Sequence, residues 1–597
     1  MVSDHKKIWE QYKKGTHYLR TSGLSDMWKE CFDFFEGRQW PEPTNKTKNL
    51  PRPVINICKM IANNKKANVL NTKVKTIFKP AELLDNVEMA QNGADIFTKF
   101  ADNIAKEMRQ EDLDDKALGH GSKVGQYIYH YYWDKEVTGG MRTPYVGAMR
   151  GEILYPNSVI FANPKENDEQ KQEYIIIATL EKVKTVEKIT KANKINEPIT
   201  ADSEFLELEE DERVDKDEYC TVLTKYSRQN GKVIIEKSTK NCIIQKAKFL
   251  TPNINEIKVN FKDEDVEEIS EPDEAIPQSA ENNFKKELYP IVVGQWDFKE
   301  NSIYGIGEIE QIRQNQKAIN FNWGMFLLSM QKTGWPTVIT KAGALKGQEI
   351  TNEPGQVITD NTPPGSGDGI KFMQPPSFPS AISNASNELL NVTRSVTGST
   401  EVSTGESFSA NMAASAIIAL QSQAKMPIDT IQKRFWRVRE KIGKIWEQFL
   451  KTYYNDGRIF SHEEDGQTEA FKLNGAEYKD VDFNLSIDIG SGSTFSEPLI
   501  VTLLQELLNL QAINVDDYID LYPDTAMPFK NKLKGIREKR IQEEMEKISQ
   551  QQMGMISGTE QKGISNLEGL PQESLNPNIE NMDKIPNKTK LAEAGLI

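Results

Sequence analysis

The sequence contains few residues of the types that hold metals or form disulfides. Its 597 residues include four cysteines and five histidines, and the histidines are scattered along the chain. No two cysteines have the Cys-x-x-Cys spacing typical of a zinc site; they stand at Cys31, Cys58, Cys220 and Cys242. We therefore expect free, buried thiols, and neither a metal nor a cofactor.

Long apolar runs are also missing. No stretch of about 18 consecutive apolar residues occurs, so no transmembrane helix is predicted. Residues 1–7 carry charges and are not followed by the apolar segment of a signal peptide. We expect a soluble, cytoplasmic protein that does not bind a membrane.

Motifs of common enzymes are absent. There is no GxxxxGK[ST] phosphate-binding motif, no HExxH zinc motif and no convincing Ser/His/Asp set. Residues 485–494 are similar to the phosphate loop of actin-like ATPases, but that loop opens its fold, whereas about 100 residues follow it here. Carboxylates at 207–218 and 263–274 could hold metals for a nuclease, yet they crowd consecutively in loops. We expect no catalytic activity.

The net charge of −14 is concentrated in two segments. Residues 202–218 contain ten acidic and two basic residues, and residues 262–281 contain nine acidic and one basic residue. These segments together carry −16, so the remainder of the chain is close to neutral. We interpret both as solvated acidic loops, with an acidic rim on a ring as the alternative.

The first half of the chain predicts a mixed body. Helical periodicity occurs in residues 1–36 and again from Val87 to Leu118, and it gives way to strand patterns between Val124 and Leu250. The strand patterns include Tyr127–Trp133 and Tyr174–Thr179, rich in aromatic and β-branched residues. The fold class that we predict is α+β.

Two amphipathic helices follow in the second half. In the first, the apolar residues recur at steps of three and four; they include Ile309, Ile312, Ile319, Trp323 and Phe326. In the second, the stripe includes Leu389, Val392 and Val396. From spacing alone, an intramolecular helix bundle explains both stripes, and packing between copies around a ring is the alternative.

Between these helices, Gly and Pro separate short apolar runs at 337–339 and 356–358, which predicts a small β-containing module. After the second helix, a polar, Gly-punctuated loop leads into an apolar stripe that extends to Phe449. This stripe predicts a long helix with a kink at Pro427, where a backbone hydrogen bond is lost. Basic residues between 433 and 444 lie either on a solvated flank or against a neighbouring subunit's acidic runs.

In their order along the chain, several segments resemble the portal proteins of tailed bacteriophages, over roughly residues 25–545. The matching segments are Phe-Glu-Gly-Arg-Gln-Trp at 35–40, Arg-Pro-Val-Ile-Asn at 52–56, Tyr-Gly-Ile-Gly at 304–307 with Gln316 and Asn320, and Ala-Ile-Ile-Ala-Leu-Gln at 416–421. The resemblance rests on this order, since no single segment is specific.

The resemblance implies a multidomain portal-like fold with a mixed α/β wing, a helical stem, a small β-containing clip, a long kinked spine helix and a helical crown. The implied boundaries are 1–300 for the wing with acidic loops at 202–218 and 262–281, 301–334 for the first stem helix, 335–379 for the clip, 380–398 for the second stem helix, 399–409 for the tunnel loop, 410–455 for the spine helix, 456–497 for wing strands, 498–550 for the crown and 551–597 for a disordered tail.

The resemblance also implies a function. The protein would form a ring, expected to be a dodecamer, at one capsid vertex of the virion, after assembly in the host cytoplasm. Terminase would package double-stranded DNA through the ring without sequence specificity, and the ring would later retain and eject the genome. Further partners would be head-completion and adaptor proteins, the major capsid protein and scaffold proteins. The alternatives are a non-ring virion scaffold or structural protein and, less favoured, a metal-dependent nuclease.

Specific residues receive expected roles from the resemblance. The seam residues of both stem helices would be buried between subunits. The tunnel loop facing DNA would comprise Ser399, Thr400, Ser403, Thr404, Gly405, Glu406, Ser407 and Phe408. Partner docking on the clip would involve Pro363, Pro364, Gly365, Asp368, Gly369 and Lys371.

Overall fold

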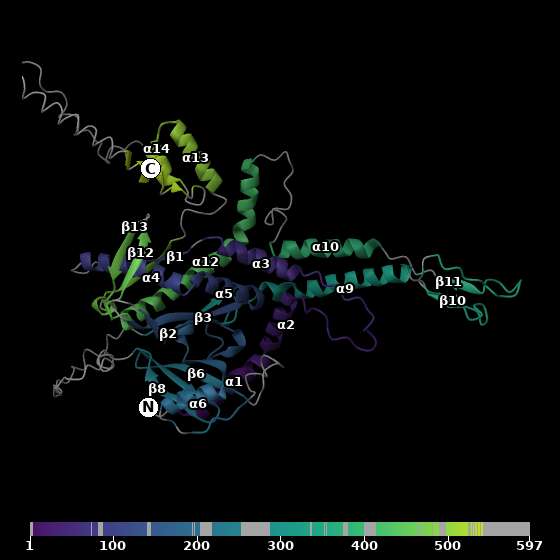
Figure 1. The fold of residues 1–597 in the computed structure, drawn as a ribbon, viewed down its shortest axis with the longest axis horizontal. Coiled ribbons are helices and arrows are strands. Elements are labelled where there is room, and N and C mark those ends of the chain that lie inside the picture. The colour runs from purple at the N-terminus through teal and green to yellow at the C-terminus, as the bar shows by residue number, and fades with distance from the viewer. Residues whose placement is uncertain are drawn as a thin grey trace, which may run out of the picture.

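The structure is a computed structural model. It describes residues 4–540 except for 73, 82–86, 140–144, 194, 196, 203–217, 252–286, 335–336, 352, 354, 374–379, 399–413, 465–466, 480, 489–496, 523–526, 528, 531, 534 and 538. Helices and several small sheets make up the body (Figure 1), so the predicted α+β class is confirmed.

The largest sheet has five antiparallel strands in the order β4-β5-β6-β7-β8. The strands are β4 (Val159–Phe161), β5 (Tyr174–Lys182), β6 (Tyr219–Gln229), β7 (Lys232–Ser238) and β8 (Ile243–Phe249). Helix α1 (His5–Thr21) contacts β4 and β6, whereas α6 (Val183–Ala192) contacts β5 and β8. The buried apolar side chains of α1 and α6 belong to two different core clusters. The sheet therefore packs against two separate groups of apolar residues.

A three-stranded sheet, in the order β3-β2-β9, lies beside the first one. Its strands are β2 (Gln126–Gly139), β3 (Tyr145–Leu154) and β9 (Ile291–Gln295). The 3-10 turn η1 (Pro156–Ser158) connects β3 to β4, and η2 (Glu169–Lys171) lies between β4 and β5 in sequence. Tyr127, Tyr129 and Tyr131 alternate toward one face of β2 and are fully buried. The strand predicted at 127–133 is therefore present and packs its aromatic face into the core.

The segment predicted to be helical from Val87 to Leu118 forms two helices, α4 (Val87–Glu107) and α5 (Gln110–Val124). Arg109 separates them with a φ of 53°, in the left-handed region. A non-glycine residue with this backbone conformation cannot continue a right-handed helix. The apolar periodicity of the sequence continues across Arg109, so it did not reveal the boundary between the two helices.

Four helices pack together at the base of the long helix α9 (Glu308–Gly334). These are the first half of α9 itself, α2 (Leu24–Glu36), α3 (Ile57–Leu70) and α5. The buried apolar side chains of α2, α9 and most of α3 join those of the five-stranded sheet in one core cluster, whereas most of those of α5 belong to a second cluster. The beginning of α9 is thus part of the body.

Helix α12 (Ala414–Tyr453) runs through the second core cluster. Phe435, Ile442 and Phe449 are among its fully buried residues. It is continuous through Pro427, and its first part points in a different direction from the remainder (Figure 1). The predicted stripe is therefore buried within the chain over most of its length.

The chain's second half completes the body. Strand β14 (Phe483–Asp488) pairs antiparallel with β1 (Lys75–Pro80), so segments about 400 residues apart form one ladder. Strands β12 (Ile459–Glu464) and β13 (Gln467–Lys472) form a separate hairpin, followed by the 3-10 turn η5 (Gly475–Tyr478). Two further helices, α13 (Glu497–Asn509) and α14 (Val515–Leu521), lie beyond β14 in sequence.

One part of the molecule projects from the body. Helices α9 and α10 (Ser380–Val396) lie side by side and extend away from it, and the antiparallel hairpin of β10 (Val338–Thr340) and β11 (Ile370–Phe372) lies at their far end (Figure 1). Of the two apolar runs in the predicted β-containing module, the first contributes to β10, whereas the run at 356–358 forms no strand and Val357 is 88% exposed.

Candidate functional site

The base of α9 holds a buried network of side-chain amides. Gln316 accepts hydrogen bonds from the backbone N–H groups of Ile57 at 3.0 Å and Cys58 at 3.3 Å, and its Nε2 donates to the carbonyl of Ile55 at 2.6 Å. Asn320, one turn later, accepts from the N–H of Ile55 at 3.2 Å and from Gln316 Nε2 at 3.0 Å. We call this network, together with its contacts described next, the amide lock.

Residues of the two N-terminal matching segments complete the amide lock. Gln39 Oε1 accepts a hydrogen bond from Asn320 Nδ2 at 2.6 Å, and Gln39 Nε2 donates to the carbonyl of Phe34 at 2.7 Å. Asn56 Nδ2 donates to the carbonyls at the end of α2, at 3.1 and 2.9 Å. Trp40 Nε1 donates to the carbonyl of Pro53 at 2.8 Å. These bonds fix the chain between α2 and α3 against α9.

The start of α9 is anchored by a buried ion pair. Lys65 Nζ lies 2.5 Å from Glu308 Oε1, and Trp296 Nε1 donates to the same oxygen at 3.1 Å. Gly305 and Gly307 pass so close to the backbone of residues 123–125 that an added Cβ would collide with it. The segments at 35–40 and 52–56 therefore meet Gln316 and Asn320 at the base of α9, and Gly305 and Gly307 lie against residues 123–125 just before that helix.

Sequence reasoning noted the order of these segments but did not predict their contact. Gln316 and Asn320 are amides at i and i+4 within an apolar stripe, and both are buried. A buried amide requires hydrogen-bond partners. Two amides one turn apart on an apolar face were therefore the signal that another backbone segment lies against this helix.

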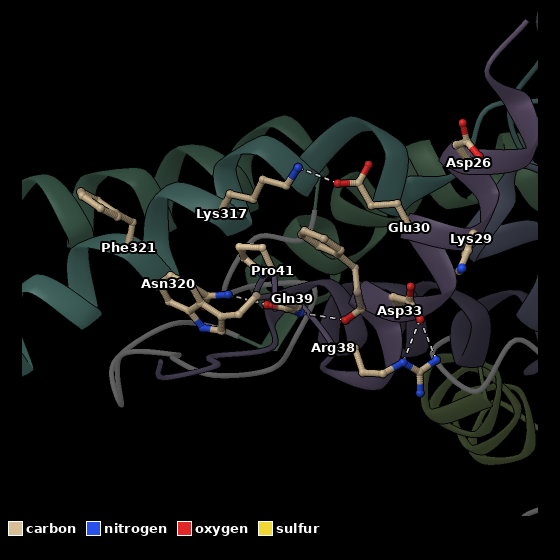
Figure 2. Close-up of a pocket in the computed structure, with 12 residues that line it drawn as sticks. Asp26, Lys29, Glu30, Asp33, Arg38, Gln39, Pro41, Lys317, Asn320 and Phe321 are labelled. Carbon is tan, nitrogen blue, oxygen red and sulfur yellow. Dashed lines mark hydrogen bonds and ion pairs between the residues drawn. The ribbon is translucent and has the colours of Figure 1, made fainter. Parts of the chain in front are cut away.

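A pocket of about 610 Å³ opens beside the amide lock. Figure 2 shows four of its charged side chains turned toward one another in pairs: Lys317 toward Glu30, and Arg38 toward Asp33. The distances are 2.5 Å for Lys317–Glu30 and 2.7 Å for Arg38–Asp33, and Arg313 also lies 2.5 Å from Glu30. The lining residues are Asp26, Lys29, Glu30, Asp33, Phe34, Arg38, Gln39, Trp40, Pro41, Lys317, Asn320 and Phe321.

The seam predicted on α9 is largely covered by its own chain. Ile309, Ile312 and Ile319 are 0–1% exposed and belong to the core cluster formed with α2 and α3. Their expected burial between subunits is therefore wrong, and the intramolecular bundle explains this half of the helix. Trp323 and Phe326, farther along, are half-buried and contact each other edge to face at 5.7 Å.

Part of the seam predicted on α10 is left uncovered by α9. Asn315 Nδ2 donates to Thr393 Oγ1 at 3.1 Å, and Ser386 and Thr393 of α10 are buried, as is Thr397 directly after the helix. Val392 and Val396 remain 42% and 65% exposed. Leu389 is half-buried and packs against the core cluster. A polar face of α10 thus packs on α9, and part of its apolar face is left uncovered.

The loop expected to dock partners is held by hydrogen bonds at the far end of the helix pair. Asp360 accepts from the N–H groups of Thr362 and Gly369, both at 2.9 Å, and these bonds lower the pKa of its exposed carboxyl, with the Thr362 hydroxyl contributing most. Lys341 Nζ donates to the carbonyls of Ser366 and Gly367. Pro363, Pro364, Gly365 and Asp368 are exposed within this loop, Gly369 is buried at its end, and Lys371 is exposed in β11.

The hairpin region has almost no core of its own. Among the described residues from 337 to 373, Ala344 is the one buried apolar side chain. Ile339, Phe372 and Met373 are each 57–58% exposed. Clusters of exposed apolar side chains often mark a surface that another molecule covers.

Basic residues of α12 pair with carboxylates of the same chain. Lys441 Nζ lies 2.9 Å from both carboxylate oxygens of Glu169. Burial raises the pKa of the Glu169 carboxyl, and the positive charge of Lys441 offsets part of this rise. Arg434 lies 2.8 Å from Asp297 Oδ1, and the buried Arg439 lies 3.7 Å from Asp114 Oδ2. Neither expected arrangement, a solvated flank or pairing with a neighbour, describes these three residues.

Several predicted features lie outside the described residues. They are the tunnel loop at 399–409, the tail at 551–597 and most of the acidic segments at 202–218 and 262–281. The four cysteines are free and buried, and burial raises the pKa of the Cys31 and Cys58 thiols to about 12. In the described part of the chain, no group of three or more His, Cys, Asp or Glu side chains is arranged to hold a metal ion. None of the described helices is both long enough and apolar enough to cross a membrane.

Comparison with protein families gives one match. The family model described as "Phage P22-like portal protein" matches residues 276–497, which contain the projecting helices α9 and α10, the hairpin between them and α12. A search of curated proteins finds no match. The family is structural, and it implies a homo-oligomeric ring at a capsid vertex of the virion. Over these residues the predicted resemblance to the portal proteins of tailed bacteriophages is confirmed.

Proposed function

We propose that this chain forms the ring, expected to be a dodecamer, through which double-stranded DNA enters and leaves the capsid. The observation that carries the proposal is the projecting pair α9–α10, which lies in the family-matched region and leaves apolar side chains uncovered. Two helices alone cannot cover all of their own faces. Neighbouring copies arranged around an axis would cover them.

The β10–β11 hairpin is the clip in this proposal. It stands at the far end of α9 and α10, where a partner can reach it, and its apolar side chains are exposed (Figure 1). Terminase would dock here during packaging, and head-completion or adaptor proteins would replace it afterwards. The loop from Pro363 to Gly369, with Lys371, would supply polar contacts beside the exposed Phe372.

DNA would pass the tunnel loop at 399–409, which connects α10 to α12. Its sequence has small hydroxyl residues and glycine, with Glu401 and Glu406 as its charges. Non-specific affinity for DNA depends on cations that neutralise phosphates. A loop without Lys or Arg would therefore touch DNA without binding it tightly, as sliding requires.

The test is the native mass of the full-length protein, measured by light scattering at micromolar concentration and accompanied by negative-stain images. We expect a ring of a single size with a central channel. A stable monomer would overturn the proposal, and an elongated non-ring particle would favour a scaffold protein. Cleavage of duplex DNA in the presence of Mg²⁺ would instead favour a nuclease.

A further inference from the structure

The first observation is an apolar ridge on α10, formed by Val392 and Val396. The two side chains are one helical turn apart, so they lie on the same side of the helix. They are 42% and 65% exposed, whereas Thr393 on the same helix is buried and bonds to Asn315 of α9. Helix α10 thus uses a polar side chain to contact α9 and leaves two valines exposed, and this apolar surface could be covered by another molecule.

The second observation is the nature of the pocket on the other helix. Phe34, Trp40, Pro41 and Phe321 give it aromatic and apolar walls, and Phe321 is 57% exposed. Four of its charged residues form ion pairs within the wall, as Figure 2 shows for Lys317 with Glu30 and for Arg38 with Asp33, and Asp26 and Lys29 add one charge of each sign. Because four of these charges are already paired with each other, the pocket suits an uncharged group better than an ionic ligand.

Within one chain, the Val396 end of the ridge lies away from Phe321 in the pocket. The bond between Asn315 and Thr393 sets the register of the antiparallel pair, so Val396 lies beside residues near 312. Phe321 is then about nine residues farther along α9, roughly 13 Å at 1.5 Å per residue. The two surfaces are therefore available to other molecules at the same time.

We infer that the Val392–Val396 ridge of one copy seats in the pocket beside Phe321 and Trp40 of the next copy. The inference rests on the proposed ring and specifies which surfaces make it. Since the two surfaces differ, the contact is heterologous, and repetition of such a contact closes into a ring when the rotation permits. The ridge is uncharged, as the neutral pocket wall requires.

Cysteine cross-linking tests this pairing directly. The variant Phe321→Cys/Val396→Cys would be treated with a short bismaleimide, with each single variant as control. The native cysteines are buried, so the introduced thiols are the accessible ones. We expect a ladder of covalent multimers from the double variant and none from the single variants. A product that stops at the dimer would contradict a heterologous contact.

Charge substitution provides an independent readout. Val396→Asp would place a carboxylate in the apolar pocket wall and should lower ring yield at least roughly tenfold. Asn391→Asp adds the same charge to the same helix at an exposed polar position and should leave the yield unchanged. Because Val396 is exposed in one copy, folding of the chain should survive, which circular dichroism would verify.

The outcomes separate the two proposals. If rings form but the double variant gives no ladder and Val396→Asp assembles normally, the pairing is wrong and the ring stands. If the unmodified protein is a monomer, the proposed function itself fails.

Discussion

At the scale of single residues, His120 should couple the stability of the body to pH. It contacts the stacked rings of Phe32 and Tyr155 edge to face, and burial, helped by nearby Lys123, lowers its pKa from 6.5 to about 4. The folded protein therefore binds this proton less readily than the unfolded chain. Stability from this group is complete above pH 6.5 and is lost as the pH falls toward 4, by at most about 3 kcal/mol.

The variant His120→Gln stays neutral and should remove this part of the acid sensitivity. Thermal unfolding of both proteins between pH 7.5 and 4.5 would show it as a smaller loss of melting temperature in the variant. His17→Gln, at an exposed position of α1, is the matched control and should follow the unmodified protein. Parallel curves for His120→Gln and the unmodified protein would contradict the prediction.

Asn320 is the second residue with a measurable role. It is 2% exposed and joins Gln39, Ile55 and Gln316 in the amide lock. In Asn320→Ala, the oxygen of Gln39 and the N–H of Ile55 would lose these partners inside the protein. Unsatisfied buried groups cost about 1–3 kcal/mol each, so urea unfolding should show a loss of roughly 2–4 kcal/mol.

Gln314→Ala is the control for that experiment, since Gln314 is exposed on the same helix. It should change the free energy of unfolding by less than about 0.5 kcal/mol. Equal effects of both substitutions would mean that helix composition, and not the amide lock, determines the result.

At the scale of elements, the clip loop depends on Asp360. Its carboxylate receives the N–H groups of Thr362 and Gly369 and so joins the two ends of the loop. We expect Asp360→Ala to make residues 361–369 more sensitive to limited proteolysis and faster in amide hydrogen exchange, with ring assembly unchanged. Asp368→Ala, within the same loop, removes a carboxylate outside these bonds and should preserve the protection. Unchanged exchange in Asp360→Ala would show that the loop is held by other contacts.

The elements themselves were more predictable from sequence than their environments. The strand at Tyr127–Trp133 and the helix beginning at Glu308 occur where periodicity predicts them. Ile319 and Val396 carry the same kind of signal, yet the first is fully buried in its own chain and the second is 65% exposed. Periodicity reports that a helix has an apolar face and does not report what covers it. That choice depends on contacts such as Ile55 with Asn320, 265 residues apart.

At the scale of the whole molecule, shortening the tunnel loop tests its proposed contact with DNA. Deletion of Ser403–Glu406 touches neither the amide lock nor the apolar residues of α9 and α10, so rings and capsids should form normally. The amount of nuclease-protected genome per particle should fall, because less of the loop would remain to hold DNA after packaging. Full retention of DNA with normal ring yield would identify the segment as a simple linker between α10 and α12.

The amide lock also sets an order of events during synthesis on the ribosome. The segment around Ile55 emerges early, but its partner Asn320 is made 265 residues later. At about 5–20 residues per second, the N-terminal segment waits roughly 13–50 s for that partner. Strand β1 waits longer still, because β14 lies near residue 488. A nascent chain therefore cannot complete the folding of its body until most of the polypeptide has left the ribosome. Association with other folded copies is delayed until then, because the surfaces that would contact them are not yet formed.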